Sequence, residues 1–229
     1  MLVSDVKNEG KTNQILKELE QLTGKSIPSA DIIDLASAHL SAIPEFFGQL
    51  QSLQVLNLSN NQLTALPESF GQLNSLQELN LGENQLTALP ESFGQLQSLQ
   101  VLDLSNNQLT ALPESFGDLK SLKKLRIYNN KLKALPESFG DLESLEALDL
   151  FKNQLTALPE SFGELKSLQT LDLSDNRLET LPASFTQSFT SALWLHLSGN
   201  PFKTEPWKIL EQLRENTRKK GKVKRWKRR

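Results

Sequence analysis

The sequence predicts an α/β solenoid of about eight coils, with a parallel β-sheet on its concave face and short 3₁₀ or helical turns on its convex face. Three observations support this fold class. A unit of 23 residues repeats without a gap from Leu53 to Leu181. Each unit alternates its leucines as a half-buried strand does. Each unit then carries an asparagine, a Leu-Pro pair and a phenylalanine at fixed positions, as stacked coils with one shared core require.

The repeating unit follows the template LxxLxLxxNxLxxLPxxFxxLxx, which is first complete from Leu53 to Ser75. Its asparagine recurs every 23 residues, at Asn61, Asn84, Asn107, Asn130, Asn153 and Asn176. A degenerate copy precedes these six and has Ala38 in place of the asparagine. A last copy follows with Asn200, displaced by one extra residue between Thr186 and Ser191. The count of coils is therefore eight.

Each fixed position has a physical role. Leucines at alternate positions predict a strand with one buried face, and consecutive coils would pair these strands in parallel about 4.8 Å apart. The asparagine amide offers donors and an acceptor to buried backbone groups, so stacked copies should form an internal ladder. The Leu-Pro pair predicts extended backbone. The following PESFGQL segment predicts a short helical turn, whose inward phenylalanines from Phe47 to Phe185 should stack.

These residues resemble the leucine-rich repeat family, and the 23-residue form with Leu-Pro before an inward apolar residue is similar to its intracellular, Ras-group and bacterial types. The resemblance covers residues 30 to 202. It implies a curved solenoid that binds proteins on its concave strand face, with small GTPases among the partners of some members. Other members precede a GTPase, kinase or ubiquitin-ligase domain, so a recognition domain separated from its catalytic partner would look the same. A designed consensus array would also share the repeats, although the irregular stretch from Thr186 to Trp194 disfavours design.

Composition indicates a single elongated domain in a reducing compartment. The chain has no cysteine, whereas secreted members of the resembling family commonly carry cysteine-rich caps. The first ten residues contain no apolar core of signal-peptide length, and no apolar stretch is long enough to span a membrane. The expected location is the cytoplasm.

The two ends of the chain predict caps for the terminal coils. We expect an N-terminal helical cap in residues 1–29, where Ile15, Leu16, Leu19 and Leu22 share one helix face. The solenoid then covers residues 30–203. A capping helix is expected in residues 204–217, with Trp207 as a lid on the last coil. Residues 218–229 form a basic tail that composition predicts to be disordered.

The basic tail supports a second function class. Residues Arg218 to Arg229 hold nine Lys or Arg and no acid, while the other 217 residues carry 16 basic and 27 acidic side chains. Such a tail binds nucleic acid or an anionic membrane, with Trp226 available for stacking or for the interface. A solvated tail attracted to its own acidic solenoid is the alternative.

Enzymatic motifs are absent from the sequence. Gly10-Lys11-Thr12 and Gly24-Lys25-Ser26 imitate the end of a phosphate-binding loop, but both lack the preceding glycine and a strand ahead of them. His39 and His196 lie at opposite ends of the solenoid, so they cannot share a metal or a nucleophile. We expect no catalytic residue, no cofactor, no metal and no small-molecule substrate.

Positions that differ between coils are the best indication of a partner. They concentrate on the outward-facing strand residues: those before, between and after the two alternating leucines, which we call the first, second and third outward positions. These positions are mainly acidic or small, but the two central coils supply Lys124, Arg126, Tyr128 and Phe151 there, with Lys152 directly after Phe151. Tyr128 and Phe151 share the third outward position in adjacent strands, so we expect their rings to touch.

We predict that these five residues anchor a protein-binding site, because exposed Tyr and Arg clusters are typical of interface hot spots. Asp103, Asp149, Asp172 and Trp194 would form its rim. The alternative is structural. Arg126 lies one strand from both Asp103 and Asp149 and offsets their repulsion, and the two rings then shield that ion pair.

Overall fold

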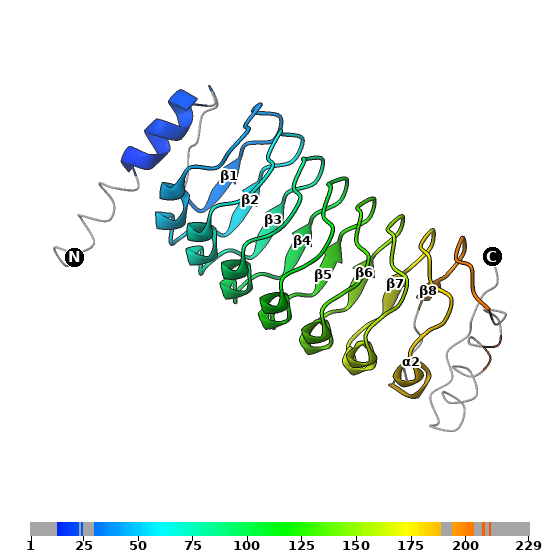
Figure 1. Ribbon diagram of the computed structural model, residues 1–229. Coiled ribbons are helices and arrows are strands. Elements are labelled where there is room, and N and C mark those ends of the chain that lie inside the picture. Colours follow the sequence, from blue (N-terminus) through cyan, green and yellow to red (C-terminus); the bar gives the residue numbers. More distant parts are fainter. Residues whose placement is uncertain are drawn as a thin grey trace.

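The structure is a computed structural model that describes residues 13–22, 24, 30–188, 194–203, 208 and 211. Short strands, one in each coil, form a single parallel sheet in which the strands follow one another in sequence order (Figure 1). They are β1 Ile32–Asp34, β2 Val55–Asn57, β3 Glu78–Asn80, β4 Val101–Asp103, β5 Lys124–Arg126, β6 Ala147–Asp149, β7 Thr170–Asp172 and β8 Trp194–His196. The solenoid of eight coils predicted from the repeat is confirmed.

The strand register follows the repeat. Leu56 pairs with Leu79, and Leu79 pairs with Leu102, so equivalent residues of successive coils lie side by side. At the last strand Thr170 pairs with Trp194, 24 residues later, which is the one-residue displacement seen in the sequence. Outward residues of the same position therefore form rows across the sheet.

The asparagine ladder is present as predicted. Asn130 Oδ1 accepts a hydrogen bond from the N–H of Leu109 in the preceding coil at 3.0 Å. Its Nδ2 donates to the carbonyls of Leu104 at 2.9 Å and Ile127 at 3.2 Å. The side chain is only 7% exposed, so these bonds satisfy backbone groups that the sheet leaves unpaired. Equivalent bonds recur at Asn61, Asn84, Asn107, Asn153, Asn176 and Asn200.

The convex side is a row of 3₁₀ helices followed by one α-helix. Each 3₁₀ helix begins after an extended proline, as at Pro113 with φ −67° and ψ 154°. The bounds are η1 Glu45–Gln49, η2 Glu68–Gln72, η3 Glu91–Gln95, η4 Glu114–Asp118, η5 Glu137–Asp141, η6 Glu160–Glu164 and α2 Ala183–Ser188. Phenylalanines from Phe70 to Phe185 stack in succession, with ring centroids 6.1–6.5 Å apart. Phe47, predicted as the first ring of this stack, instead stacks on Phe46 at 6.4 Å, and the ring contacts of the described residues do not join it to Phe70.

The glycine that follows the inward phenylalanine of each 3₁₀ helix has a role that the sequence template omits. A Cβ placed on Gly117 would lie 2.7 Å from the carbonyl carbon and the Cβ of Ser138 in the next coil, and closer still to the carbonyl oxygen of that serine. In real proteins a Cβ atom essentially never lies this close to the backbone of another residue. Glycine therefore lets adjacent 3₁₀ helices approach closely enough for the phenylalanine rings to stack.

A helix covers residues 13–22 at the N-terminal end of the solenoid, beside β1 (Figure 1). Ile15 and Leu19 are buried in the same core as the coils, whereas Leu22 is 57% exposed. The prediction that Leu22 shares the buried face is therefore wrong, because the buried face stops one turn earlier. Apart from residues 208 and 211, the predicted capping helix 204–217 with Trp207 and the tail 218–229 lie outside the described residues.

We predict that Gly117→Ala destabilises the protein by about 1–3 kcal/mol, the usual range for overpacking a rigid contact. Gly82→Ser is the matched control. The nearest atoms to an added Cβ at Gly82 belong to side chains, at 3.2 Å, and serine occupies the same position at Ser59 and Ser105. Chemical denaturation of both variants checks this, and equal free energies of unfolding would refute the packing role of Gly117.

Candidate functional site

The second outward position shapes the backbone as well as the surface. In most coils it is Asp or Asn, and its Oδ1 accepts a hydrogen bond from the backbone N–H two residues later. Asp103 accepts from Ser105 at 2.9 Å, Asp149 from Phe151 at 3.0 Å and Asp172 from Ser174 at 2.8 Å. Asp34, Asn57 and Asn80 do the same. The predicted rim carboxylates are thus committed, through one oxygen each, to ending their strands.

This structural role was missed by the sequence reasoning, although a signal exists. Asp or Asn stands at the second outward position of six coils, and such side chains commonly hydrogen-bond the backbone two residues later. The acidic face of the sheet is therefore partly a consequence of strand termination. Where a coil has neither Asp nor Asn at the second outward position, strand termination does not explain the side chain found there.

Arg126 is one such side chain. A guanidinium has no acceptor atom, so Arg126 cannot bond the N–H of Tyr128 as an aspartate would. Its Nη1 instead lies 3.7 Å from Asp103 Oδ2. The Arg126 side chain is 61% exposed and the Asp103 side chain 18% exposed, so this ion pair adds little stability. Arg126 gives up a strand-ending hydrogen bond while keeping its charge in solvent.

The third outward position does not hold the predicted ring pair. Tyr128 and Phe151 are half-buried neighbours, but the ring contacts among the described residues do not include this pair. The Tyr128 hydroxyl instead accepts a hydrogen bond from Asn106 Nδ2 at 3.4 Å. The rings of Tyr128 and Phe151 therefore do not form one aromatic cluster.

Lys152 is exposed and has a left-handed backbone, with φ 58°. The same position has Asn106 and Asn129 in neighbouring coils, which tolerate this conformation better than lysine does. Glu83 shares the conformation with φ 56°, so the strain at Lys152 does not by itself mark a site.

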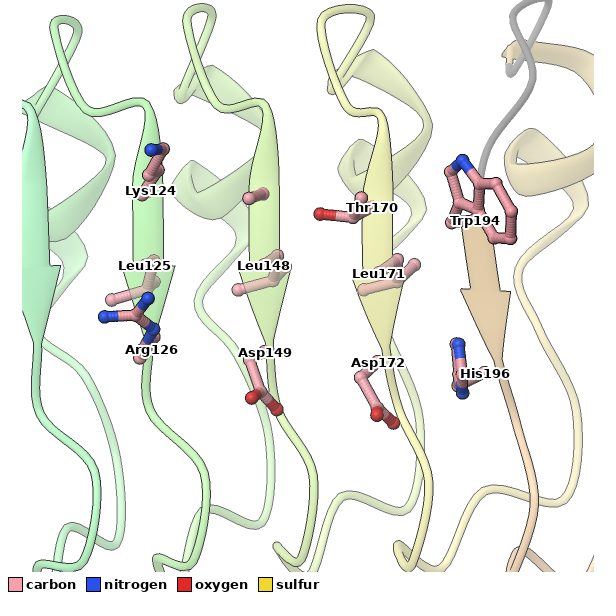
Figure 2. Close-up of a pocket in the computed structure, with 11 residues that line it drawn as sticks. Lys124, Leu125, Arg126, Leu148, Asp149, Thr170, Leu171, Asp172, Trp194 and His196 are labelled. Carbon is pink, nitrogen blue, oxygen red and sulfur yellow. The ribbon is translucent and has the colours of Figure 1, made fainter.

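An open hollow of about 420 Å³ lies on the sheet over β5 to β8 (Figure 2). Five predicted site residues line it: Lys124, Arg126, Asp149, Asp172 and Trp194. The sequence reasoning left out three further outward residues in the lining, Ala147, Thr170 and His196. The lining does not include Asp103, Tyr128, Phe151 or Lys152. The candidate site is thus displaced from the aromatic pair toward the C-terminal coils.

Trp194 closes the hollow on the β8 side, where its indole stands clear of the sheet (Figure 2). Trp194 is 60% exposed. Among the described residues, the other large apolar residues with a similar exposed fraction are Ile32 and Leu22, near the other end of the chain. Between Lys124 and Trp194 the first outward position holds only the small side chains of Ala147 and Thr170. This sequence of large, small, small and large side chains makes the hollow.

Asp149 has an altered acidity. Burial raises the pKa of its carboxyl above the ordinary value of 3.8, and the neighbouring carboxylate of Asp172 raises it further. The hydrogen bond from the Phe151 N–H and the charge of Arg126 oppose this shift in pKa only in part. The raised pKa of Asp149 is thus first an effect of burial and then of the neighbouring carboxylates.

Within the described residues, no group of three His, Asp or Glu side chains is placed to hold a metal ion. In the same part of the chain, the helices are too short or too polar to cross a bilayer.

The fold and this strand-face hollow define a repeat protein of the solenoid class. The sequence matches three family models: Leucine-rich repeat region over residues 75–154, Leucine rich repeat over 28–86, and Leucine Rich repeats (2 copies) over 143–185. The chain belongs to the leucine-rich repeat family. Domains of this family are generally protein-interaction modules and are typically not enzymes.

Solved structures agree with this assignment. A leucine-rich repeat protein of Leptospira interrogans is 36% identical, with a TM-score of 0.56 over 76% of this chain and 50% of its own. The ectodomain of the Arabidopsis thaliana receptor kinase GASSHO1/SCHENGEN3, in complex with CASPARIAN STRIP INTEGRITY FACTOR 2, is 27% identical, with a TM-score of 0.56 over 75% of this chain and 27% of its own. This chain thus spans half or less of either structure. Among curated proteins, none matches the sequence.

We predict that Arg126→Asn stabilises the protein by about 0.5–1 kcal/mol, because the new Oδ1 restores the strand-ending hydrogen bond to Tyr128. Lys124→Asn is the control, since it removes a cation from the same strand without creating that bond. Thermal and chemical denaturation measure both. A destabilised Arg126→Asn protein would show that Arg126 serves the fold.

We also predict that Asp149→Asn raises stability at neutral pH and has a smaller effect in acid. Because the native pKa is raised, the native state binds the proton more tightly than the unfolded chain does. The contribution of Asp149 to stability is therefore full below the unfolded pKa and is lost as the pH rises through the folded pKa. Asparagine stays neutral and can still accept from Phe151. Unfolding curves of both proteins across the acid range check this, and a gain that does not change with pH would contradict it.

Proposed function

We propose that this chain is a non-enzymatic binding module that holds an extended segment of a partner protein, or a peptide, across its concave face. The hollow over β5 to β8 is the single feature that carries this proposal. An exposed tryptophan, two cations and two carboxylates converge there on small residues, and the surface has space for a ligand. Buried aromatic and arginine anchors in such pockets dominate many protein interfaces.

The departure of Arg126 from the strand-ending pattern supports the same location. Local rules of folding are most often broken at functional positions, where binding outweighs local stability. The neighbouring Tyr128, Phe151 and Lys152 remain part of the proposed site as an edge beside the hollow. The receptor ectodomain in complex with CASPARIAN STRIP INTEGRITY FACTOR 2 is a case of binding by a similar fold.

Finer assignments rest on the sequence alone. A scaffold or signalling role in the cytoplasm, with a small GTPase as one kind of partner, is the proposal that the family resemblance and the lack of cysteine favour. The basic tail from Arg218 to Arg229 lies outside the described residues. Binding of nucleic acid or an anionic membrane by that tail would weaken steeply as the salt concentration rises. It would also be lost on deletion of residues 218–229, which separates it from binding at the hollow.

The test is a selection of random displayed peptides on the full-length protein, followed by affinity measurements at moderate salt. We predict that Thr170→Arg weakens the selected ligands by at least about tenfold, because the new side chain fills the hollow. Tyr128→Ala combined with Phe151→Ala should weaken them less, since both rings lie outside the hollow.

Thr110→Arg is the matched control, because Thr110 is an exposed threonine of a loop outside the sheet. It adds the same charge and volume and should leave the affinity unchanged. Ligands that bind Thr170→Arg as tightly as the unaltered protein would overturn the proposed function.

A further inference from the structure

Charge is distributed unevenly along the hollow. Its β5 wall carries the cations of Lys124 and Arg126, its middle carries Asp149 on β6 and Asp172 on β7, and its β8 wall carries Trp194 (Figure 2). A ligand that crosses the strands therefore meets positive charge, then negative charge, then an aromatic face. The order of these surfaces restricts which side chain fits at each point.

Neither of the two central carboxylates forms an ion pair within the described residues, although the charge of Arg126 acts on Asp149 from the neighbouring strand. Asp149 and Asp172 are directly paired across β6 and β7, and like charges in that relation repel. Within the described part of the chain, Arg126 forms its ion pair with Asp103, and no cation lies within ion-pair distance of Asp149 or Asp172. Figure 2 shows the Arg126 guanidinium turned away from Asp149.

Each of the two aspartates also has an oxygen to offer. One carboxylate oxygen of Asp149 accepts from Phe151, and one of Asp172 accepts from Ser174. The second oxygen of each is available to a donor from outside the chain, because a carboxylate accepts at both oxygens. A lysine or arginine side chain supplies the positive charge and several donors at once.

Trp194 is the third feature of the hollow that suits a basic side chain. An exposed indole attracts a cation over its face, and arginine stacks on it as well. The small side chains of Ala147 and Thr170 leave space for the aliphatic stem of a long basic residue between the indole and the carboxylates. Lys124 repels a second basic residue at the β5 wall, so the site favours one basic side chain placed over β6 to β8.

We propose that the hollow is a subsite for a single arginine or lysine side chain of the bound polypeptide, with Asp149 and Asp172 as its countercharge and Trp194 as its stacking face. This inference rests on the proposed function and specifies its ligand. The occupant is a segment of a partner protein with one basic anchor. The basic tail of this chain itself, or a purely apolar segment, would be a different occupant.

The experiment uses the peptides selected on the full-length protein and compares Asp172→Asn with Asp34→Asn. Both changes remove one carboxylate from the second outward position, and asparagine keeps the acceptor oxygen for the backbone, as Asn57 and Asn80 do. Asp34 lies on β1, outside the hollow. We expect selected peptides to share an arginine or lysine and to lose about tenfold in affinity with Asp172→Asn, but less than about twofold with Asp34→Asn, whose charge is distant and screened.

Further binding measurements identify which polypeptide segment occupies the hollow. Replacing the shared basic residue of a selected peptide by glutamine should weaken binding to the unaltered protein and remove the difference caused by Asp172→Asn. Trp194→Leu should reduce binding of arginine peptides and keep the fold. A synthetic peptide of residues 218–229 that competes for the site with the same dependence on Asp172 would identify the tail as an occupant and overturn a partner-only site.

The outcomes separate the two proposals. Peptides that are blocked by Thr170→Arg but share no basic residue would overturn the basic subsite and leave the concave face as the binding surface. Equal losses with Asp172→Asn and Asp34→Asn would show attraction to overall charge and also overturn the subsite. Peptides unaffected by Thr170→Arg would overturn the proposed function itself.

Discussion

One side-chain amide in each coil after the first, the ladder asparagine, makes the interaction on which the solenoid depends. The carbonyl of Leu58 accepts from Asn61 of its own coil and from Asn84 of the next coil, so each amide joins two coils. A buried backbone group left without a partner destabilises a protein by about 1–3 kcal/mol. The ladder therefore fixes the path of the chain where it leaves each strand. Because that path is the same in every coil, the outward strand residues line up in rows and can form one continuous surface.

Two requirements, to end a strand and to present a side chain to solvent, apply to the same positions of that surface. Asp103, Asp149 and Asp172 end their strands through a hydrogen bond to the backbone, and the same side chains present negative charge to solvent. Arg126 presents a positive charge to solvent and cannot end its strand in this way, since it cannot accept a hydrogen bond. The concave face is thus a mixture of residues retained for the backbone and residues that are free to differ. Residues of the first group can still bind a partner through the carboxylate oxygen that the backbone does not use.

The sequence predicted the fold in detail because the repeat states each structural role many times. The strand leucines, the ladder asparagines and the inward phenylalanines all lie where their periodicity places them. The role of Gly117 was not predictable in the same way, because it depends on a close approach to Ser138 that only the three-dimensional stack reveals. The sequence did not predict the hollow, although five of the proposed site residues line it. Comparison of the coils with one another singled out the large and charged residues on its walls. Ala147 and Thr170 contribute through the space that their small side chains leave, and a comparison of residue types does not reveal such space. The contact expected between Tyr128 and Phe151 failed because shared row position does not determine side-chain direction.

The asparagine ladder also gives the solenoid a direction. Each amide reaches back toward the N-terminus, as Asn200 does when it accepts from Leu178 and donates to Leu173. Every coil thus offers its successor the bonding groups that its predecessor offered to it. A whole unit can be duplicated or deleted within the array and still find matching neighbours on both sides. The length of the array can therefore change in evolution by steps of one coil, while the arrangement of any local group of strands, including β5 to β8, is inherited unchanged.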